Sequence, residues 1–232
     1  LHSDTHSFPT RRSSDLHQTY LAGSALTSTP TVISPTQLMD GIIVSGNYDI
    51  GSTRNPTYMY QCCPIVEELF QRQRLGKLLF SSVIVTKCLI ETYAGKRRSA
   101  CLAAQAARLL KADGVIISVE ECGQAYADLM LTCQACEDLG MHTVLLMAES
   151  AGATGAKPVP IAFVQEANAV ISVGNMDEVI SLPGMDIVLG GDWPCGRWPL
   201  DAMASEAMDT SLVNIFAATC QMGPSTLRGE TR

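Results

Sequence analysis

Four short apolar runs, separated by stretches of helical length, constrain the fold of this chain more than any other feature. The runs span residues 79–86, 114–118, 142–147 and 169–173 and are rich in β-branched residues, as strands covered on both faces are. About 12 to 16 residues of helical pattern lie between them, the crossover length that parallel strands require. We therefore predict an α/β protein with an open, mostly parallel, doubly wound sheet of about four to six strands, a flavodoxin-like or Rossmann-like three-layer sandwich.

The composition favours a soluble, cytoplasmic protein whose partners are small molecules or other proteins. At 232 residues the chain is long enough for one well-buried domain, and its 47% of apolar residues suits an ordinary core. No stretch approaches the roughly 18 apolar residues that a membrane span needs. The net charge of −7, without a run of Lys or Arg, disfavours nucleic acid as a partner. Nine cysteines, an odd number scattered through the core pattern, favour a reducing cytosol over disulfides.

The two ends of the chain differ in character from its middle. Residues 1–16 contain Ser7–Leu16, which looks like a translated sequencing adapter and is not expected to contribute to the fold. Residues 17–36 are rich in Ser, Thr and Pro, which predicts a linker or a fragment of an upstream region. The predicted domain spans residues 37–192, and residues 193–232 are predicted to form a divergent carboxyl-terminal segment.

Four segments of the chain resemble segments of a known family, both in their residues and in the order in which they occur. They are Asn55-Pro56-Thr57-Tyr58, Ala112–Ser118, Glu149–Gly152 and Gly174–Met185. Together they resemble the substrate-binding component B of glycine, sarcosine and betaine reductases, to which the D-proline reductase proprotein is related. The likeness covers the carboxyl-terminal part of the family's longer precursor.

This resemblance implies an oxidoreductase subunit that takes part in the reductive deamination of a small amino acid or amine. In the family, internal cleavage of the precursor leaves a pyruvoyl group that binds the substrate amine in some members, and a separate selenoprotein takes part in the reduction. The implied partners are therefore a small amine or amino-acid substrate and other subunits of a reductase complex, in an oligomeric assembly. A pyruvoyl group is the cofactor that the resemblance suggests.

The family's cleavage residue is a Cys shortly before the Asn-Pro-Thr-Tyr stretch, and this chain has no Cys upstream of Cys62. Counting back from Asn55 places Ser52 there, whereas counting forward from Asp40 places Asn47 there. Ser can attack its own preceding carbonyl and then eliminate, and Asn cannot by that route, so Ser52 is the candidate pyruvoyl-forming catalytic residue. Composition alone predicts a simple turn at this place, and we expect the chain to stay uncleaved.

The resemblance also suggests substrate-binding residues, several of which follow a predicted strand. Glu120 could hold a substrate ammonium or could merely favour the positive end of the next helix. Glu149 precedes a loop of small residues, 151–155, whose amides could receive a carboxylate or a phosphate. Asn175 either binds a ligand or bonds its own backbone in a turn. We expect Glu120, Glu149 and Asn175 to approach one another at one edge of the sheet. The candidates are Asn55, Tyr58, Glu120, Gly123, Asp128, Glu149, Gly174 and Asn175.

The Cys133-x-x-Cys136 pair admits a redox, a metal or a core interpretation. Ala125, Leu129 and the two cysteines recur at helical spacing, so both thiols belong to the apolar stripe of a helix and are predicted to be buried and unoxidised. Outside residues 1–16 only two histidines remain, which are too few to complete the usual set of about four zinc ligands. No metal is expected.

Two hypotheses of function stand nearly level. The chain is either the substrate-binding subunit of a reductase complex or a non-catalytic ligand-binding or assembly paralogue. The second is favoured by departures from the family pattern, since Cys62-Cys63 replaces two asparagines and Gln124-Ala125-Tyr126 replaces Asn-Pro-Asp. A generic flavodoxin-like binding domain has less support, because no phosphate-binding glycine loop follows a predicted strand.

Overall fold

The structure is a computed structural model of the whole chain. It describes residues 16–18, 23–24, 30–45, 57–87, 92–119, 123–155, 162–192 and 202–215. For residues 16–18, 23–24, 43–45 and 57–58 it describes the backbone alone.

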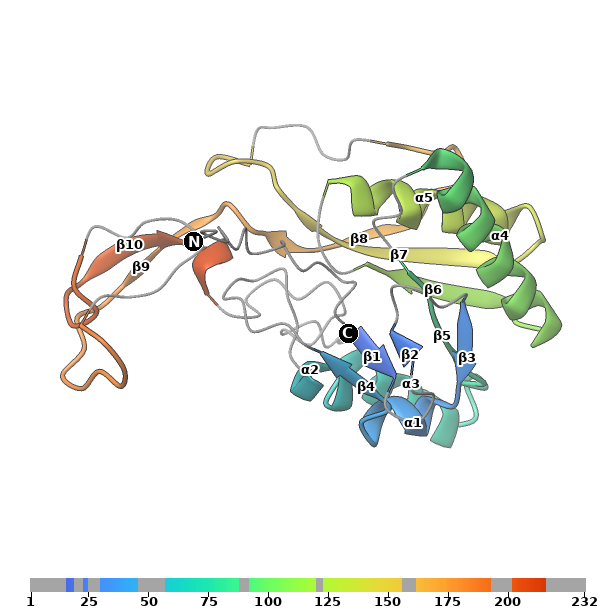
Figure 1. The fold of residues 1–232 in the computed structure, drawn as a ribbon, viewed down its shortest axis with the longest axis horizontal. Helices are drawn as coiled ribbons and strands as arrows, with labels where there is room; N and C mark the ends of the chain where they lie inside the picture. The colour runs from blue at the N-terminus through green and yellow to red at the C-terminus, as the bar shows by residue number, and fades with distance from the viewer. Residues whose placement is uncertain are drawn as a thin grey trace, which may run out of the picture.

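A three-stranded parallel sheet forms the centre of the described chain (Figure 1). Its strands are β6 (Gly114–Ser118), β7 (His142–Glu149) and β8 (Val170–Asn175), in the order β6-β7-β8. Both pairings are parallel, with Gly114 opposite His142 and Leu145 opposite Val170. Three of the four predicted strands are therefore confirmed as members of a parallel sheet.

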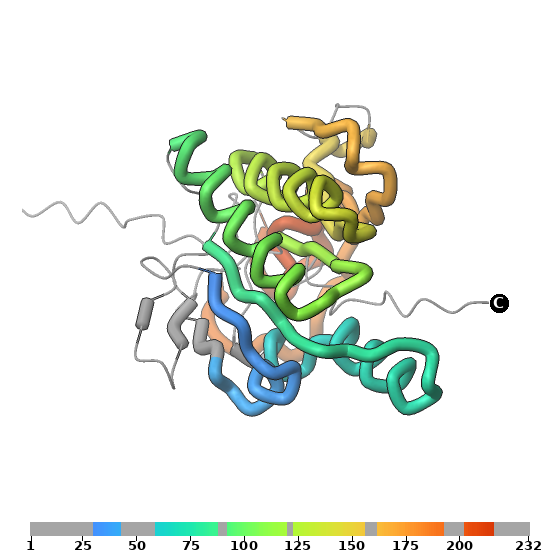
Figure 2. The backbone as a smooth tube through the Cα atoms, turned by 90° about the vertical axis from the view of Figure 1, so that its right-hand side faces the viewer, coloured from blue at the N-terminus to red at the C-terminus, as the bar shows by residue number. Residues whose placement is uncertain are grey.

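Two helices cover one face of this sheet (Figure 1). They are α4 (Tyr93–Leu109) and α5 (Gln124–Glu137), and α5 is the crossover between β6 and β7. Figure 2 shows α4 and α5 lying side by side. They approach closely because the buried stripe of α4 consists mostly of small side chains: Ala100, Ala103, Ala104 and Ala107.

Alternate residues of β7 pack on opposite sides of the sheet, as the period of a strand requires. Leu145 and Met147 lie in one cluster with Leu129, Cys133 and other apolar residues of α5. Leu146 and Ala148 belong to a second cluster, against which Ile65 of α3 (Pro64–Arg74) packs. Coverage on both faces explains why this strand is apolar along nearly its whole length.

The fourth predicted strand does not join the parallel sheet. Within the described residues, β5 (Val83–Val85) pairs antiparallel with β3 (Thr31–Ile33), and Thr31 lies opposite Val85. The prediction that β5 is a parallel strand was therefore wrong, and the parallel sheet of the described residues has three strands rather than four to six. The reason is that the Ser, Thr and Pro around Thr31–Ile33 concealed a β-branched partner for β5.

A smaller lobe surrounds this antiparallel pair. It contains α1 (Pro35–Met39), α2 (Thr57–Gln61) and α3, together with the three-stranded sheet β2-β1-β4. Its core cluster includes Ile33, Leu38, Ile42, Tyr60 and Val66. The strands of that sheet are β1 (Leu16–Gln18), β2 (Gly23–Ser24) and β4 (Ile43–Ser45).

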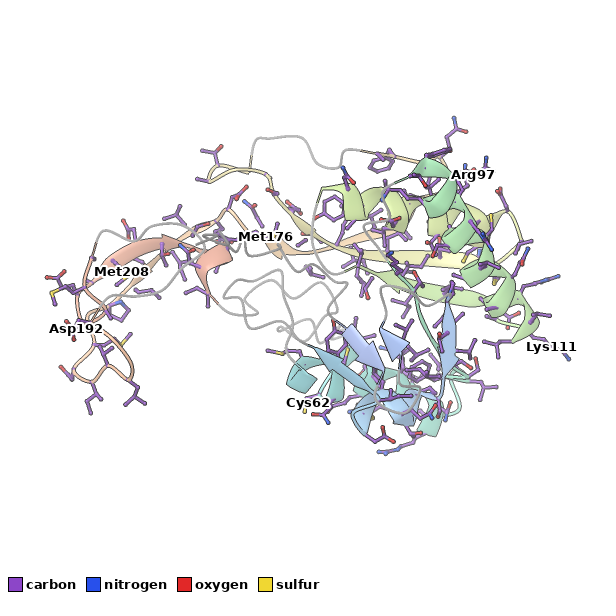
Figure 3. All side chains as sticks on the ribbon, in the orientation of Figure 1. Cys62, Arg97, Lys111, Met176, Asp192 and Met208 are labelled. Carbon is purple, nitrogen blue, oxygen red and sulfur yellow. The ribbon has the colours of Figure 1, made fainter. Side chains whose placement is uncertain are left out.

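An antiparallel ribbon extends from the carboxyl end of β8 (Figures 1 and 3). It is formed by β9 (Val179–Leu182) and β10 (Met208–Ser211), with Leu182 opposite Met208. A short 3₁₀ helix, η2 (Leu212–Asn214), returns it to the sheet, where the Val213 amide donates to the Met176 carbonyl at 2.8 Å. None of the helices in the described ranges has the length and hydropathy to span a membrane.

Candidate functional site

The carboxyl ends of β7 and β8 bring two of the predicted site residues together. Glu149 and Asn175 are register partners at the ends of these strands, and the Met176 amide donates to the Glu149 carbonyl at 2.8 Å. Both side chains are half-buried. Glu120, the third residue expected here, lies outside the described residues.

A β-bulge sets the direction of Asn175. Met147 lies opposite Ser172 and Glu149 lies opposite Asn175, so three steps along β8 match two along β7. Gly174 takes up the extra residue with φ of 119°, a conformation that L side chains rarely adopt. The structure thus gives Gly174 a backbone role in placing Asn175.

The side chain of Asn175 fixes the loop that follows β7. Its Oδ1 accepts from the Ala151 amide at 3.1 Å and from the Asp177 amide at 3.2 Å. Its Nδ2 donates to the Gly152 carbonyl at 2.9 Å. The carboxamide is therefore bonded to backbone groups of two loops, and it holds residues 150–152 in one shape.

Asp177 completes this link. Its Oδ2 accepts from the Gly152 amide at 2.8 Å and from the Ser150 hydroxyl at 3.2 Å. The sequence predicted that amides of this loop could receive a carboxylate, and in the structure the Gly152 amide receives one from the chain itself. Asp177 was not predicted as a site residue. The sequence did contain a hint, because Asn and Asp placed two positions apart just after a strand often bond to nearby backbone groups.

The amino end of α5 lies beside the same edge. Gly123 precedes the helix with φ of 70° and ψ of −118°, and its carbonyl accepts from the Tyr126 amide at 3.1 Å. The hydroxyl of Tyr126, which is 1% exposed, donates to the Ala148 carbonyl near the end of β7. The start of α5 is thereby tied to the strand that leads into the Glu149 loop.

Asp128, another predicted site residue, forms a buried ion pair between the two helices. Its Oδ2 lies 2.7 Å from Lys96 Nζ of α4, and each side chain is 9% exposed. Lys96 Nζ also donates to the Gln124 carbonyl at 3.4 Å. Lys96 was not among the predicted site residues, yet its spacing to Ala100 and Ala104 places it on the buried stripe of α4.

The predicted burial of Cys133 and Cys136 is confirmed, since they are 0% and 1% exposed and both thiols are free. The Thr143 hydroxyl donates to Glu137 at 2.7 Å, so the Cys133 thiol, 3.2 Å from that hydroxyl oxygen, is the donor to it. Burial raises the pKa of both thiols, that of Cys136 to about 11. These are protonated thiols in a core, not activated nucleophiles.

The remaining predicted residues contribute less to the described site. Ser52 and Asn55 lie outside the described residues, and Tyr58 is placed only by its backbone in α2. Cys62 is exposed, whereas Cys63 is buried immediately before α3. Across the parts of the chain that the structure describes, no group of three or more His, Cys, Asp or Glu side chains is arranged to hold a metal ion.

Comparison with known proteins identifies the family to which this α/β chain belongs. Residues 10–228 match the profile of the family described as glycine/sarcosine/betaine reductase component B subunits. The chain belongs to this family. No solved structure matches it.

Three relatives illustrate the range of the family. The glycine reductase complex component B subunits alpha and beta of Peptoclostridium acidaminophilum are 36% identical over 90% of this chain and 49% of the relative. Betaine reductase complex component B subunit alpha of the same organism is 34% identical over 69% of this chain and 36% of the relative. Sarcosine reductase complex component B subunit alpha, also of this organism, is 33% identical over 75% of this chain and 41% of the relative. The chain thus spans about half the length of the relatives it matches, or less.

Proposed function

We propose that this chain is a substrate-binding part of a reductase complex that removes the amino group from a small amino acid or amine by reduction. The observation that carries this proposal is the family match over residues 10–228. The linked loops after β7 and β8 support it, because ligands of parallel α/β sheets bind outside the carboxyl ends of the strands. We also propose that the parallel sheet of the whole chain has a flavodoxin-like or Rossmann-like arrangement.

The chemistry of the loop edge suits such a substrate. Glycine, sarcosine and betaine, which the relatives' names mention, share a carboxylate and a nitrogen one carbon away. The loop 150–152, which offers backbone amides and the hydroxyl of Ser150, can bind the carboxylate. The carboxylate of Glu149, half-buried at the end of β7, can attract the positively charged nitrogen.

A role inside an assembly is supported by the tip of the β9–β10 ribbon. Ile187 and Leu189, which lie between the two strands in sequence, are 80% and 94% exposed. A two-stranded ribbon has little core of its own, and exposed apolar side chains are typical of protein–protein contacts. We propose another subunit of the reductase complex as the partner here. A selenoprotein subunit, as the family suggests, belongs to the same proposal.

The alternative function is a non-catalytic paralogue that binds ligand or supports assembly. The observation that favours it is that the given sequence has no Cys upstream of Cys62, so that of the two residues that can be counted to the family's cleavage position, Ser52 and Asn47, only Ser52 could form a pyruvoyl group. A second departure is Tyr126, whose buried hydroxyl bonds to the backbone of β7 where the family pattern has Asp. We infer that the chain stays uncleaved.

Isothermal titration calorimetry of the full chain with glycine, sarcosine and betaine in turn tests whether the chain binds these substrates. At least one of the three should bind with a measurable heat. A folded chain, as judged by circular dichroism, that binds none of them would contradict the proposal.

Processing is tested separately by measuring the intact mass of the purified chain after treatment with a carbonyl-directed hydrazine label. An uncleaved, unlabelled chain supports the non-catalytic alternative. Cleavage before Ser52 would instead leave a shorter piece that has a ketone in place of a free amine. A labelled piece of that mass would establish the pyruvoyl enzyme and overturn our inference about processing.

A further inference from the structure

The loop after β7 contains a carboxylate-binding arrangement that the chain fills with its own side chain. The Gly152 amide and the Ser150 hydroxyl both donate to one oxygen, Oδ2 of Asp177, at 2.8 and 3.2 Å. Two donors that converge on a single carboxylate oxygen are the kind of arrangement with which proteins bind anions.

We propose that Gly152 N and Ser150 Oγ form the subsite for the carboxylate of a zwitterionic amino acid or betaine, and that Asp177 occupies this subsite until the ligand displaces it. This inference rests on the proposed function, which supplies the ligand class. It adds the atoms that bind the carboxylate and an internal competitor for them.

The loop does not depend on Asp177 alone for its shape. Asn175 bonds to the Ala151 amide and to the Gly152 carbonyl at 3.1 and 2.9 Å, groups different from those that hold Asp177. When the Asp177 side chain leaves, these two bonds keep the Gly152 amide in place. The subsite is therefore preformed, which lowers the cost of binding a ligand there.

The position of the residues allows the exchange to occur. Ser150 is exposed and Asp177 is half-buried, so solvent reaches the pair. A rotation of the Asp177 side chain is sufficient to exchange one carboxylate for another at the Gly152 amide. No covalent step is involved.

The exchange also predicts selectivity among ligands. The displaced carboxylate of Asp177 stays close to the bound ligand, and it repels a simple anion such as acetate. A zwitterion brings a positive nitrogen that the freed carboxylate attracts. The intact site should therefore prefer glycine, sarcosine or betaine to acetate.

The test follows the Gly152 amide by ¹⁵N-resolved NMR of the full chain during titration with acetate and with glycine. In the wild-type chain, glycine should shift this amide at lower concentration than acetate. In Asp177→Ala, acetate should bind about tenfold or more tightly than in the wild type, because the competing charged hydrogen bonds are gone. The preference for glycine over acetate should shrink at the same time.

Two further variants keep the test decisive. Ser150→Ala, combined with Asp177→Ala, should weaken acetate binding again because one donor is lost. Asp177→Asn removes the charge but keeps a side chain of similar size, and it takes the place of Asp177→Ala if that variant does not fold. It should also bind acetate more tightly than the wild type does. Asp209→Ala is the matched control, since Asp209 accepts from Ser181 at 2.6 Å on the exposed ribbon, and it should behave as the wild type.

The inference is overturned if a folded Asp177→Ala, or Asp177→Asn in its place, binds acetate no more tightly than the wild type at the Gly152 amide. This outcome is distinguishable from failure of the proposed function. Acetate could still bind to the Asp177→Ala subsite if the wild-type chain bound none of the three family substrates. Conversely, the wild type could bind glycine while its Gly152 amide stayed unperturbed, which would place the carboxylate elsewhere.

Discussion

Lys96 of α4 and Asp128 of α5 form an ion pair at 2.7 Å in which each side chain is only 9% exposed. The same lysine donates to the Gln124 carbonyl in the first turn of α5, at 3.4 Å. One side chain therefore links α4 to the beginning of the helix that follows the predicted Glu120 loop. Charges so well covered are stabilising only as a pair, because each has lost most of its hydration.

Removing one member of this pair should destabilise the fold strongly. Lys96→Met keeps most of the buried stem and leaves the Asp128 carboxylate without its lysine, so we expect a loss of about 3–5 kcal/mol in the free energy of unfolding. The control is Arg72→Met, which breaks the more exposed Arg72–Glu68 pair at 2.8 Å and should cost less than about 1 kcal/mol. Urea denaturation measures both. Equal losses in the two variants would show that the Lys96–Asp128 pair is not the linking contact we describe.

The bulge at Gly174 yields a second stability prediction. Gly174 has φ of 119°, and a side chain there is strained, so Gly174→Ala should lower the free energy of unfolding by about 1–3 kcal/mol. Gly114→Ala serves as the control, because a Cβ at Gly114 would meet only the His142 carbonyl oxygen at 3.7 Å, an ordinary contact. It should be neutral or slightly stabilising. Tolerance of alanine at both positions would argue against the bulge.

The buried thiols predict how reactivity and stability change with pH. Burial raises the pKa of Cys136 from 9.0 to about 11 and also raises that of Cys133, so both should resist alkylation near neutral pH, whereas exposed Cys62 and Cys101 react. Peptide mapping after iodoacetamide treatment distinguishes the four sites. Rapid labelling of Cys133 and Cys136 before unfolding would contradict their place in the core.

The same shift fixes the sign of the stability change. Between pH 9.0 and about 11 the Cys136 thiol stays protonated in the folded chain and ionises in the unfolded chain. The folded state then binds more protons, so its stability should fall as pH rises through this range. Urea denaturation across the range should show a smaller fall for Cys136→Ala. An identical pH dependence in the wild type and the variant would rule out this linkage.

The central strands and the position of the candidate edge could be predicted from the sequence because they depend on local patterns. Residues 114–118, 142–147 and 169–173 contain apolar runs that match β6, β7 and β8 closely. Parallel strands place their ends at one edge, so the proximity of Glu149 and Asn175 followed from the topology. Likewise, the helical spacing of Cys133 and Cys136 was sufficient to predict their burial.

Contacts between distant segments could not be predicted in this way. The partner of β5 is Thr31–Ile33, a three-residue strand in a stretch whose composition resembles a linker. The bonds from Asp177 to Ser150 and Gly152 join loops about 25 residues apart, and the choice of Asp177 depends on side-chain geometry that no periodicity encodes. Lys96 lies on a buried alanine stripe, but only the packing of α4 on α5 identifies Asp128 as its partner.

The most direct test of the proposed function is the binding of glycine, sarcosine and betaine to three forms of the full chain. These are the wild type, Asn175→Ala, which frees the loop that follows β7, and Asn168→Ala, which changes an exposed side-chain amide just before the start of β8. We predict that Asn175→Ala reduces binding at least about tenfold through loss of the preformed loop, while Asn168→Ala binds as the wild type does. Circular dichroism confirms that each variant is folded. Binding of equal strength in all three forms would contradict a site at the Glu149–Asn175 edge.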